Sequence, residues 1–122
     1  MTDDPGKPRI VYRIVWSNPP DHEDFKSYEE LGKRPGVDDP RFDRLLSGIS
    51  VYSSLSHTRK KAKGFPWKSR CFIAELALPN DDRVHLEQTE PGSKHYTLWC
   101  DEDLIRASII RIIPMRERQD DL

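Results

Sequence analysis

The sequence predicts a single α+β domain with a split sheet that is mixed or mostly antiparallel. Short β-branched and aromatic runs recur along the chain, and the expected helices gather in the first half while most strands come later. A chain of 122 residues can bury one core and has little room for a second. We expect the domain to span residues 9–114, with flexible charged tails at 1–8 and 116–122.

The first half is expected to begin with a strand over residues 9–16, covered on both faces and stopped by Pro19 and Pro20. Asp21 is a candidate N-cap for a helix of about three turns that ends at Gly32. Asp39 and the proline after it open a second helix, which leads into a strand over 48–53.

The second half is predicted to hold one helix near its start and then a series of strands. Turn residues separate these segments, and one short helix precedes the last strand. The expected elements are a helix over 56–63, strands over 71–78, 84–88 and 96–100, a helix over 101–107, and a strand over 109–113.

The charge of the chain is balanced overall but uneven along the sequence. The net charge of −1 gives the whole molecule no bulk attraction to nucleic acid or to an anionic membrane. Residues 59–70, however, contain six basic residues and no acidic ones. Two cysteines, no apolar leader and no apolar run near the ~20 residues of a membrane span predict a soluble, cytoplasmic protein with reduced thiols.

Several well-known catalytic signatures are absent from the sequence. It has no glycine-rich phosphate loop, no Gly-x-Ser-x-Gly elbow, no His-Glu-x-x-His and no Cys-x-x-Cys pair. The histidines and cysteines do not fall at the spacings of a zinc site, so we expect no metal.

A set of polar residues on the predicted strands is the main candidate for a ligand site. Arg13 lies on the first strand, the strand over 48–53 ends in hydroxyls before a predicted helix, and His95 follows a Pro-Gly turn. A strand that delivers such groups to a helix N-terminus is a common anion site. The simpler interpretations are an ion-paired Arg13, a plain helix cap at Ser53 or Ser54, and a hydrogen-bonded surface His95.

The pattern of these residues resembles the ADP-ribosyltransferase-like fold. The order of elements over 96–114, a strand, an acidic turn, a short helix and a last strand, is similar to the same family. The resemblance implies that NAD is the cofactor. It implies that Arg13 holds the NAD phosphates, that Ser53 or Ser54 supports this arginine, and that Tyr52 stacks near the nicotinamide.

The sequence departs from this family at the start of the late strand. The family has a catalytic glutamate there, whereas this chain has Lys94 followed by His95. A fixed anion stabilises the positive charge that develops on the ribose, so its loss affects the chemistry directly. His95, as a proton carrier, and Glu90, as a nearby carboxylate, are the candidate catalytic residues. The resemblance implies either transfer of ADP-ribose to a macromolecule or a catalytically altered member.

The basic segment supports a different hypothesis. Its cations alternate with aromatic residues, which is typical of surfaces that contact phosphates and stack bases. The chain would then be a non-enzymatic domain that binds nucleic acid or an acidic protein, and the simplest alternative is a solvated helix face. The candidate contact residues are Arg59, Lys60, Lys61, Lys63, Trp67 and Lys68.

Overall fold

The computed structural model describes residues 7–27, 47–64, 71–89 and 91–115. Within these residues, strands dominate and the helices are short. In chain order the elements are β1 (Arg9–Val15), the 3-10 turn η1 (His22–Phe25), β2 (Ile49–Tyr52), α2 (Leu55–Ala62), β3 (Phe72–Leu78), β4 (His85–Gln88), β5 (His95–Trp99), α3 (Glu102–Ala107) and β6 (Ile109–Pro114).

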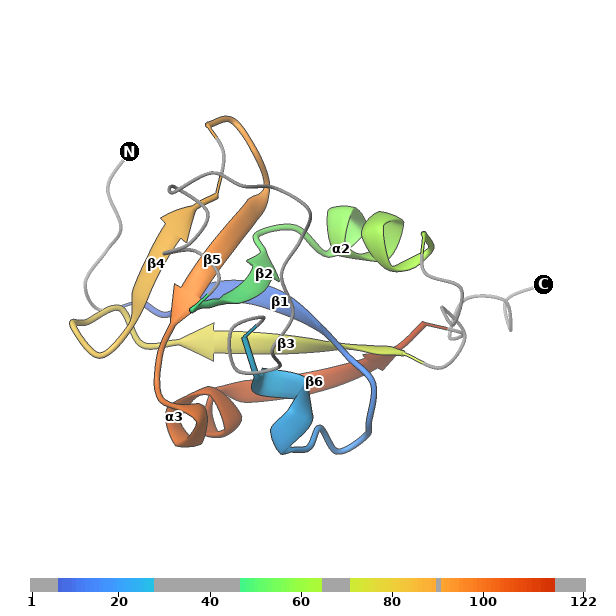
Figure 1. Ribbon diagram of the computed structural model, residues 1–122, viewed down its shortest axis with the longest axis horizontal. Helices are drawn as coiled ribbons and strands as arrows, with labels where there is room; N and C mark the ends of the chain where they lie inside the picture. The colour runs from blue at the N-terminus through green and yellow to red at the C-terminus, as the bar shows by residue number, and fades with distance from the viewer. Residues whose placement is uncertain (1–6, 28–46, 65–70, 90, 116–122) are drawn as a thin grey trace.

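The strands form one six-stranded sheet in the order β4-β5-β2-β1-β3-β6 (Figure 1). All pairings between these described strands are antiparallel. The α+β class is therefore confirmed, and the parallel component that a mixed sheet would require is not found among the described strands. Antiparallel neighbours can be joined by short connections, which fits the short turns of the second half.

The two halves of the sheet meet at a narrow junction between β1 and β2. β1 pairs with β3 along its whole length, from Arg9 opposite Leu78 to Val15 opposite Phe72. The pairing of β1 with β2 is centred on Tyr12 opposite Tyr52. The sheet is thus continuous by hydrogen bonding, but its two three-stranded halves separate beyond this junction.

The core lies on the face of the sheet that η1 and α3 cover. Phe25 of η1 and Ile105 of α3 belong to the same buried cluster as Val11, Ile49 and Leu98 of the sheet. The opposite face of β1 is only partly covered, since Ile10 is 40% and Trp16 44% exposed. The expectation that β1 is covered on both faces is therefore wrong at its two ends.

The helix predicted from Asp21 is much shorter than expected. Asp21 does cap it, accepting a hydrogen bond from Glu23 N, but only the four residues of η1 are helical before Lys26 becomes extended. The carbonyl oxygen of Asp24, which a continuing helix would use four residues later, accepts two hydrogen bonds from Arg13. A tertiary contact therefore competes with the next helical turn. The helix predicted from Asp39 lies outside the described residues.

The predicted helix over 56–63 is confirmed as α2, within a residue at each end. Ser54 is its N-cap, and its hydroxyl accepts a hydrogen bond from His57 N. The buried positions of α2 are Thr58 and Ala62, and the helix contacts β1 and β2. The later predicted strands and the short helix are likewise confirmed, with ends that differ by at most one residue.

Candidate functional site

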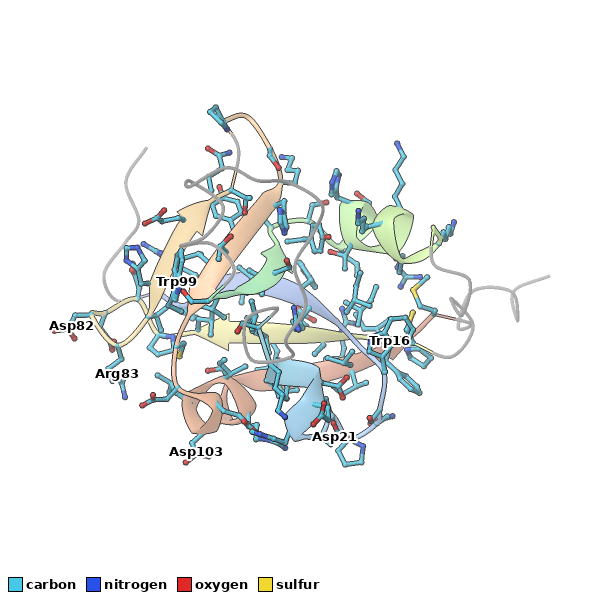
Figure 2. All side chains as sticks on the ribbon, in the orientation of Figure 1. Trp16, Asp21, Asp82, Arg83, Trp99 and Asp103 are labelled. Carbon is cyan, nitrogen blue, oxygen red and sulfur yellow. The ribbon has the colours of Figure 1, made fainter. Side chains whose placement is uncertain are left out.

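The first candidate site is an open cavity of about 570 Å³ where β1 and β2 separate. This volume is within the usual range for small-molecule sites. η1 and the connection before it form one wall and α2 contributes to another, and Figure 2 shows Trp16 and Asp21 on this connection. The described residues that line it are Arg13, Ile14, Trp16, Ser17, Asp21, Glu23, Asp24, Lys26, Ser27, Gly48, Ile49, Ser50, Tyr52 and Lys61.

Arg13 bridges the three segments that form this cavity. Its Nε and Nη2 donate to the carbonyl oxygen of Asp24 at 3.0 and 2.8 Å, and its Nη1 donates to the carbonyl oxygen of Ser50 at 2.8 Å. The bond to Ser50 crosses from β1 to β2 beyond the Tyr12–Tyr52 junction. Both acceptors of these three bonds are neutral carbonyl oxygens, so the bonds orient the guanidinium without cancelling its charge.

The wall formed by η1 is fixed through the buried carboxylate of Asp24. Its Oδ1 accepts a hydrogen bond from Trp16 N at 2.7 Å, and its Oδ2 accepts one from Asp21 N at 3.1 Å. The residue is only 5% exposed, and charge-assisted bonds of this kind are among the stronger ones in proteins. Asp24 therefore holds the end of β1 against η1 and sets the shape of the cavity.

The charged groups of the cavity include both signs. Lys26 forms an ion pair with Glu23 at 2.9 Å, which offsets part of the charge at the mouth. Lys61 enters the lining from α2, a helix without acidic residues. The lining residues comprise three cations, Arg13, Lys26 and Lys61, and three carboxylates, Asp21, Glu23 and Asp24, so the cavity has cationic groups for an anionic ligand but no net positive charge.

Tyr52 connects the cavity to a group of ring side chains at the end of β2. Its ring centroid lies 5.8 Å from that of His57 and 5.1 Å from that of His95, both in tilted orientations. His95 is the cross-strand neighbour of Tyr52 on β5, and its N–H donates to Ser93 Oγ at 2.8 Å. Tyr52 is 7% exposed, so its ring is held firmly between the two imidazoles.

The structure brings some of the predicted site residues together and separates others. Arg13 and Tyr52 line the same cavity, whereas Ser53, Ser54 and His95 are not among its described lining residues. Ser54 caps α2, and the N–H of Ser53 donates to the carbonyl oxygen of Lys94. His95 does contact Tyr52, which lines the cavity.

The basic segment divides between described and undescribed residues. Arg59, Lys60 and Lys61 lie on α2 and Lys63 is its C-cap, while Trp67 and Lys68 lie outside the described residues, as does Glu90. Sequence reasoning missed the part that Trp16, Ser50 and Lys61 play in lining the cavity. The prolines after Trp16 predict that the chain turns there, but the neighbouring sequence does not indicate the direction of the turn.

A second cavity, of about 510 Å³, lies on the other side of Ile49 and includes Trp99, Cys100 and Glu102. Burial, followed by the neighbouring charge of Asp101, raises the pKa of the Cys100 thiol. Burial also raises the pKa of the Cys71 thiol. Neither cysteine is in a disulfide, and because their pKa values are raised both thiols stay protonated at neutral pH, so neither is an activated nucleophile there.

The described residues form neither a metal cluster nor a membrane-spanning helix. Nowhere in residues 7–27, 47–64, 71–89 or 91–115 do three histidine, cysteine or acidic side chains gather as metal ligands would. None of the helices in this part of the chain has the length and apolar character to span a bilayer. Compared with family models, with curated proteins and with solved structures, the chain shows no match.

Proposed function

We propose that this domain binds NAD or a related dinucleotide in the cavity between β1 and β2, as an ADP-ribosyltransferase-like domain. The observation that carries the proposal is that Arg13 and Tyr52, which come from different strands, line one cavity of about 570 Å³. Because Tyr12 is directly opposite Tyr52, the Arg13 side chain starts from the other face of the sheet, and a shared ligand would reach both groups through the gap where β1 and β2 separate.

We assign the phosphates of the ligand to Arg13 of β1 and Lys61 of α2. The Arg13 guanidinium is oriented by neutral carbonyl groups, and Lys61 extends from α2 into the same space. An arginine fork is suited to two phosphate oxygens, and a lysine acts as a mobile point charge. The hydroxyl of Ser50, on the wall between them, is a further hydrogen-bonding group.

A ring system of the ligand is assigned to the aromatic side chains of the wall. Trp16, which is 44% exposed and lines the cavity, is the accessible ring, whereas Tyr52 is 7% exposed against His57 and His95 and offers only part of its surface. Offset stacking on such rings is favourable for a flat heterocycle. Ser53 and Ser54 remain predictions as ligands, because their described contacts are with the backbone and the α2 cap.

If the bound dinucleotide is NAD, the reaction that this family predicts is transfer of its ADP-ribose to an acceptor. The bond between nicotinamide and ribose breaks, and its electron pair leaves with nicotinamide. The acceptor nucleophile then bonds to the ribose carbon and gives its proton to a base. His95 and Glu90 remain the predicted groups for this chemistry, and the carboxylates of Asp21 and Glu23 on the cavity wall are further anions for the developing charge.

Thermal unfolding with and without NAD tests the binding proposal. Ligand that binds only the native state stabilises it by mass action, so about 1 mM NAD should raise the midpoint by about 4 °C if the dissociation constant is near 0.1 mM. Lys61→Met keeps the aliphatic stem and removes the charge, and we expect it to reduce the shift by more than half.

Lys60→Met is the matched control, because Lys60 is exposed on the same helix and is not among the described lining residues. It should leave the NAD shift unchanged. No shift with NAD, NADP or ADP-ribose at millimolar concentration would overturn the proposal. An undiminished shift in Lys61→Met would place the nucleotide outside this cavity.

A further inference from the structure

We propose that the outward face of α2 binds single-stranded nucleic acid, with Lys60, Lys61 and Lys63 holding phosphates and His57 stacking a base. This surface is distinct from the cavity, although the two share Lys61. The proposal goes beyond nucleotide binding because it concerns a polymer that contacts the outside of the helix.

The geometry of α2 puts His57, Lys60 and Lys63 on one face, with Lys61 at its edge next to the cavity. Thr58 and Ala62 are buried, whereas His57, Lys60 and Lys61 are exposed. Positions three and four apart lie on the same side of a helix, which relates His57 to Lys60 and Lys61, and Lys60 to Lys63. Cations spaced in this way along a helix can follow successive phosphates of a strand.

The surface carries positive charge that no ion pair between described residues offsets. The sequence from residue 47 to residue 64 contains no aspartate or glutamate. Among the ion pairs of the described part of the chain, none involves Lys60, Lys61 or Lys63. The net charge of the whole chain is −1, so this concentration of cations is a local feature rather than the consequence of a basic protein.

The composition of this face favours nucleic acid over an acidic protein. Protein interfaces are built around apolar and aromatic anchors and are depleted in lysine. The large exposed hydrophobic residues of the described chain are Ile10, Trp16 and Ile110, none of which lies on α2. A face made of lysine, serine and histidine instead has the groups that contact phosphates.

The ring of His57 favours a single strand over a duplex. It is exposed in the first turn of α2 and lies against Tyr52, which fixes its position next to the lysines. Unpaired bases can stack on a histidine ring, whereas the bases of a duplex are already stacked. Because Lys61 belongs to both the helix and the cavity lining, a strand bound on α2 would lie next to the mouth of the cavity. If the cavity transfers ADP-ribose, this strand would be near the reaction, and this point alone rests on the proposed function.

Fluorescence anisotropy with a labelled single-stranded oligonucleotide of about 20 nucleotides tests the surface. We expect binding that weakens steeply between about 50 and 200 mM salt, because each phosphate contact contributes a slope of about −0.7 for single strands. The double substitution K60E/K63E should lower the affinity at least tenfold and reduce the slope by about 1–2. His57→Ala should weaken single-strand binding at all salt concentrations.

Lys7→Glu is the control for net charge and matches Lys60→Glu. Lys7 is exposed just before β1 and lies far from α2 along the chain. It should leave oligonucleotide binding unchanged. Equal losses in Lys7→Glu and Lys60→Glu would overturn the assignment to α2.

Two competitors complete the test. Tighter binding of a duplex of the same length would overturn the single-strand preference, and binding of polyglutamate without binding of the oligonucleotide would favour an acidic protein. The NAD-induced thermal shift should persist in K60E/K63E. Loss of oligonucleotide binding with a retained NAD shift separates this surface from the cavity, so either proposal can fail while the other stands.

Discussion

The guanidinium of Arg13 contacts the carbonyl oxygen of Asp24 through two donors, with Nε at 3.0 Å and Nη2 at 2.8 Å. This contact joins the middle of β1 to the short turn η1, and it stands where the predicted helix fails to continue past Lys26. A third donor reaches Ser50 on β2. Arg13 therefore organises the cavity as well as lining it.

Arg13→Ala should lower the free energy of unfolding by about 2–4 kcal/mol, because hydrogen bonds from a charged donor contribute about 1.5–3 kcal/mol each and are not additive. Arg13→Lys should recover part of this loss, since one ammonium cannot reproduce the fork. Urea denaturation measures both. Arg111→Ala is the control, because Arg111 pairs with Glu75 while 58% exposed and should cost under about 1 kcal/mol. Equal costs at the two arginines would contradict the bridging role.

Gly48→Ala should destabilise the domain by about 1–3 kcal/mol, the usual range for overpacking. A methyl group at Gly48 would lie 2.5 Å from Thr97 Cγ2 and 2.9 Å from the carbonyl oxygen of Leu98. The backbone oxygen cannot move without disturbing the pairing of β2 with β5.

Thermal and urea unfolding measure the effect, with Gly64→Ala as the comparison. At Gly64 the closest atom to an added methyl group is the carbonyl oxygen of Lys61 at 3.3 Å, so the cost there should be smaller. A Gly48→Ala protein as stable as the parent would show that β2 and β5 are less closely packed than described.

Glu102 should make stability depend on pH in the acid range. Its hydrogen bond from Arg106, and then that from His22, keep the pKa of the carboxyl below its ordinary value of 4.5. Because the folded-state pKa is the lower one, this stabilisation is present above the ordinary pKa and is lost as pH falls through the folded-state pKa.

Urea denaturation at a series of pH values between about 5 and 2 tests this contribution. Glu102→Gln should flatten the profile in that range, whereas Asp103→Asn, at an exposed position next in α3, should leave it steep. An unchanged profile in Glu102→Gln would mean that the contact between η1 and α3 through His22 contributes little.

Much of the fold could be predicted because its signals are local. Alternating apolar residues marked β1, and Ser54 followed by a polar helix marked the start of α2, where the hydroxyl does cap His57 N. The expected cap at Asp21 was also correct. The helix predicted after Asp21 was too long because Arg13, on β1, donates to the carbonyl oxygen of Asp24. A contact between residues so far apart in the chain leaves no local pattern in the sequence.

The candidate site was predictable only in part for the same reason. Arg13 and Tyr52 could be chosen as polar residues on neighbouring strands, but that both line one cavity depends on the separation of β1 and β2 just beyond the Tyr12–Tyr52 pair. Lys61 was assigned to a basic surface, and its second position on the cavity wall depends on how α2 packs against β1 and β2. The position of Trp16 depends on the path of the chain between β1 and η1, and the sequence does not predict the direction of that path.

The most direct test of the account is an NMR titration of the isotope-labelled protein with NAD. Binding between β1 and β2 should shift the Nε–H resonance of Arg13, the indole resonance of Trp16 and the amide of Ser50, while the indole of Trp99, in the second cavity, stays in place. Shifts confined to Trp99 and its neighbours, or no shifts at millimolar NAD, would contradict the proposal that this cavity binds the dinucleotide.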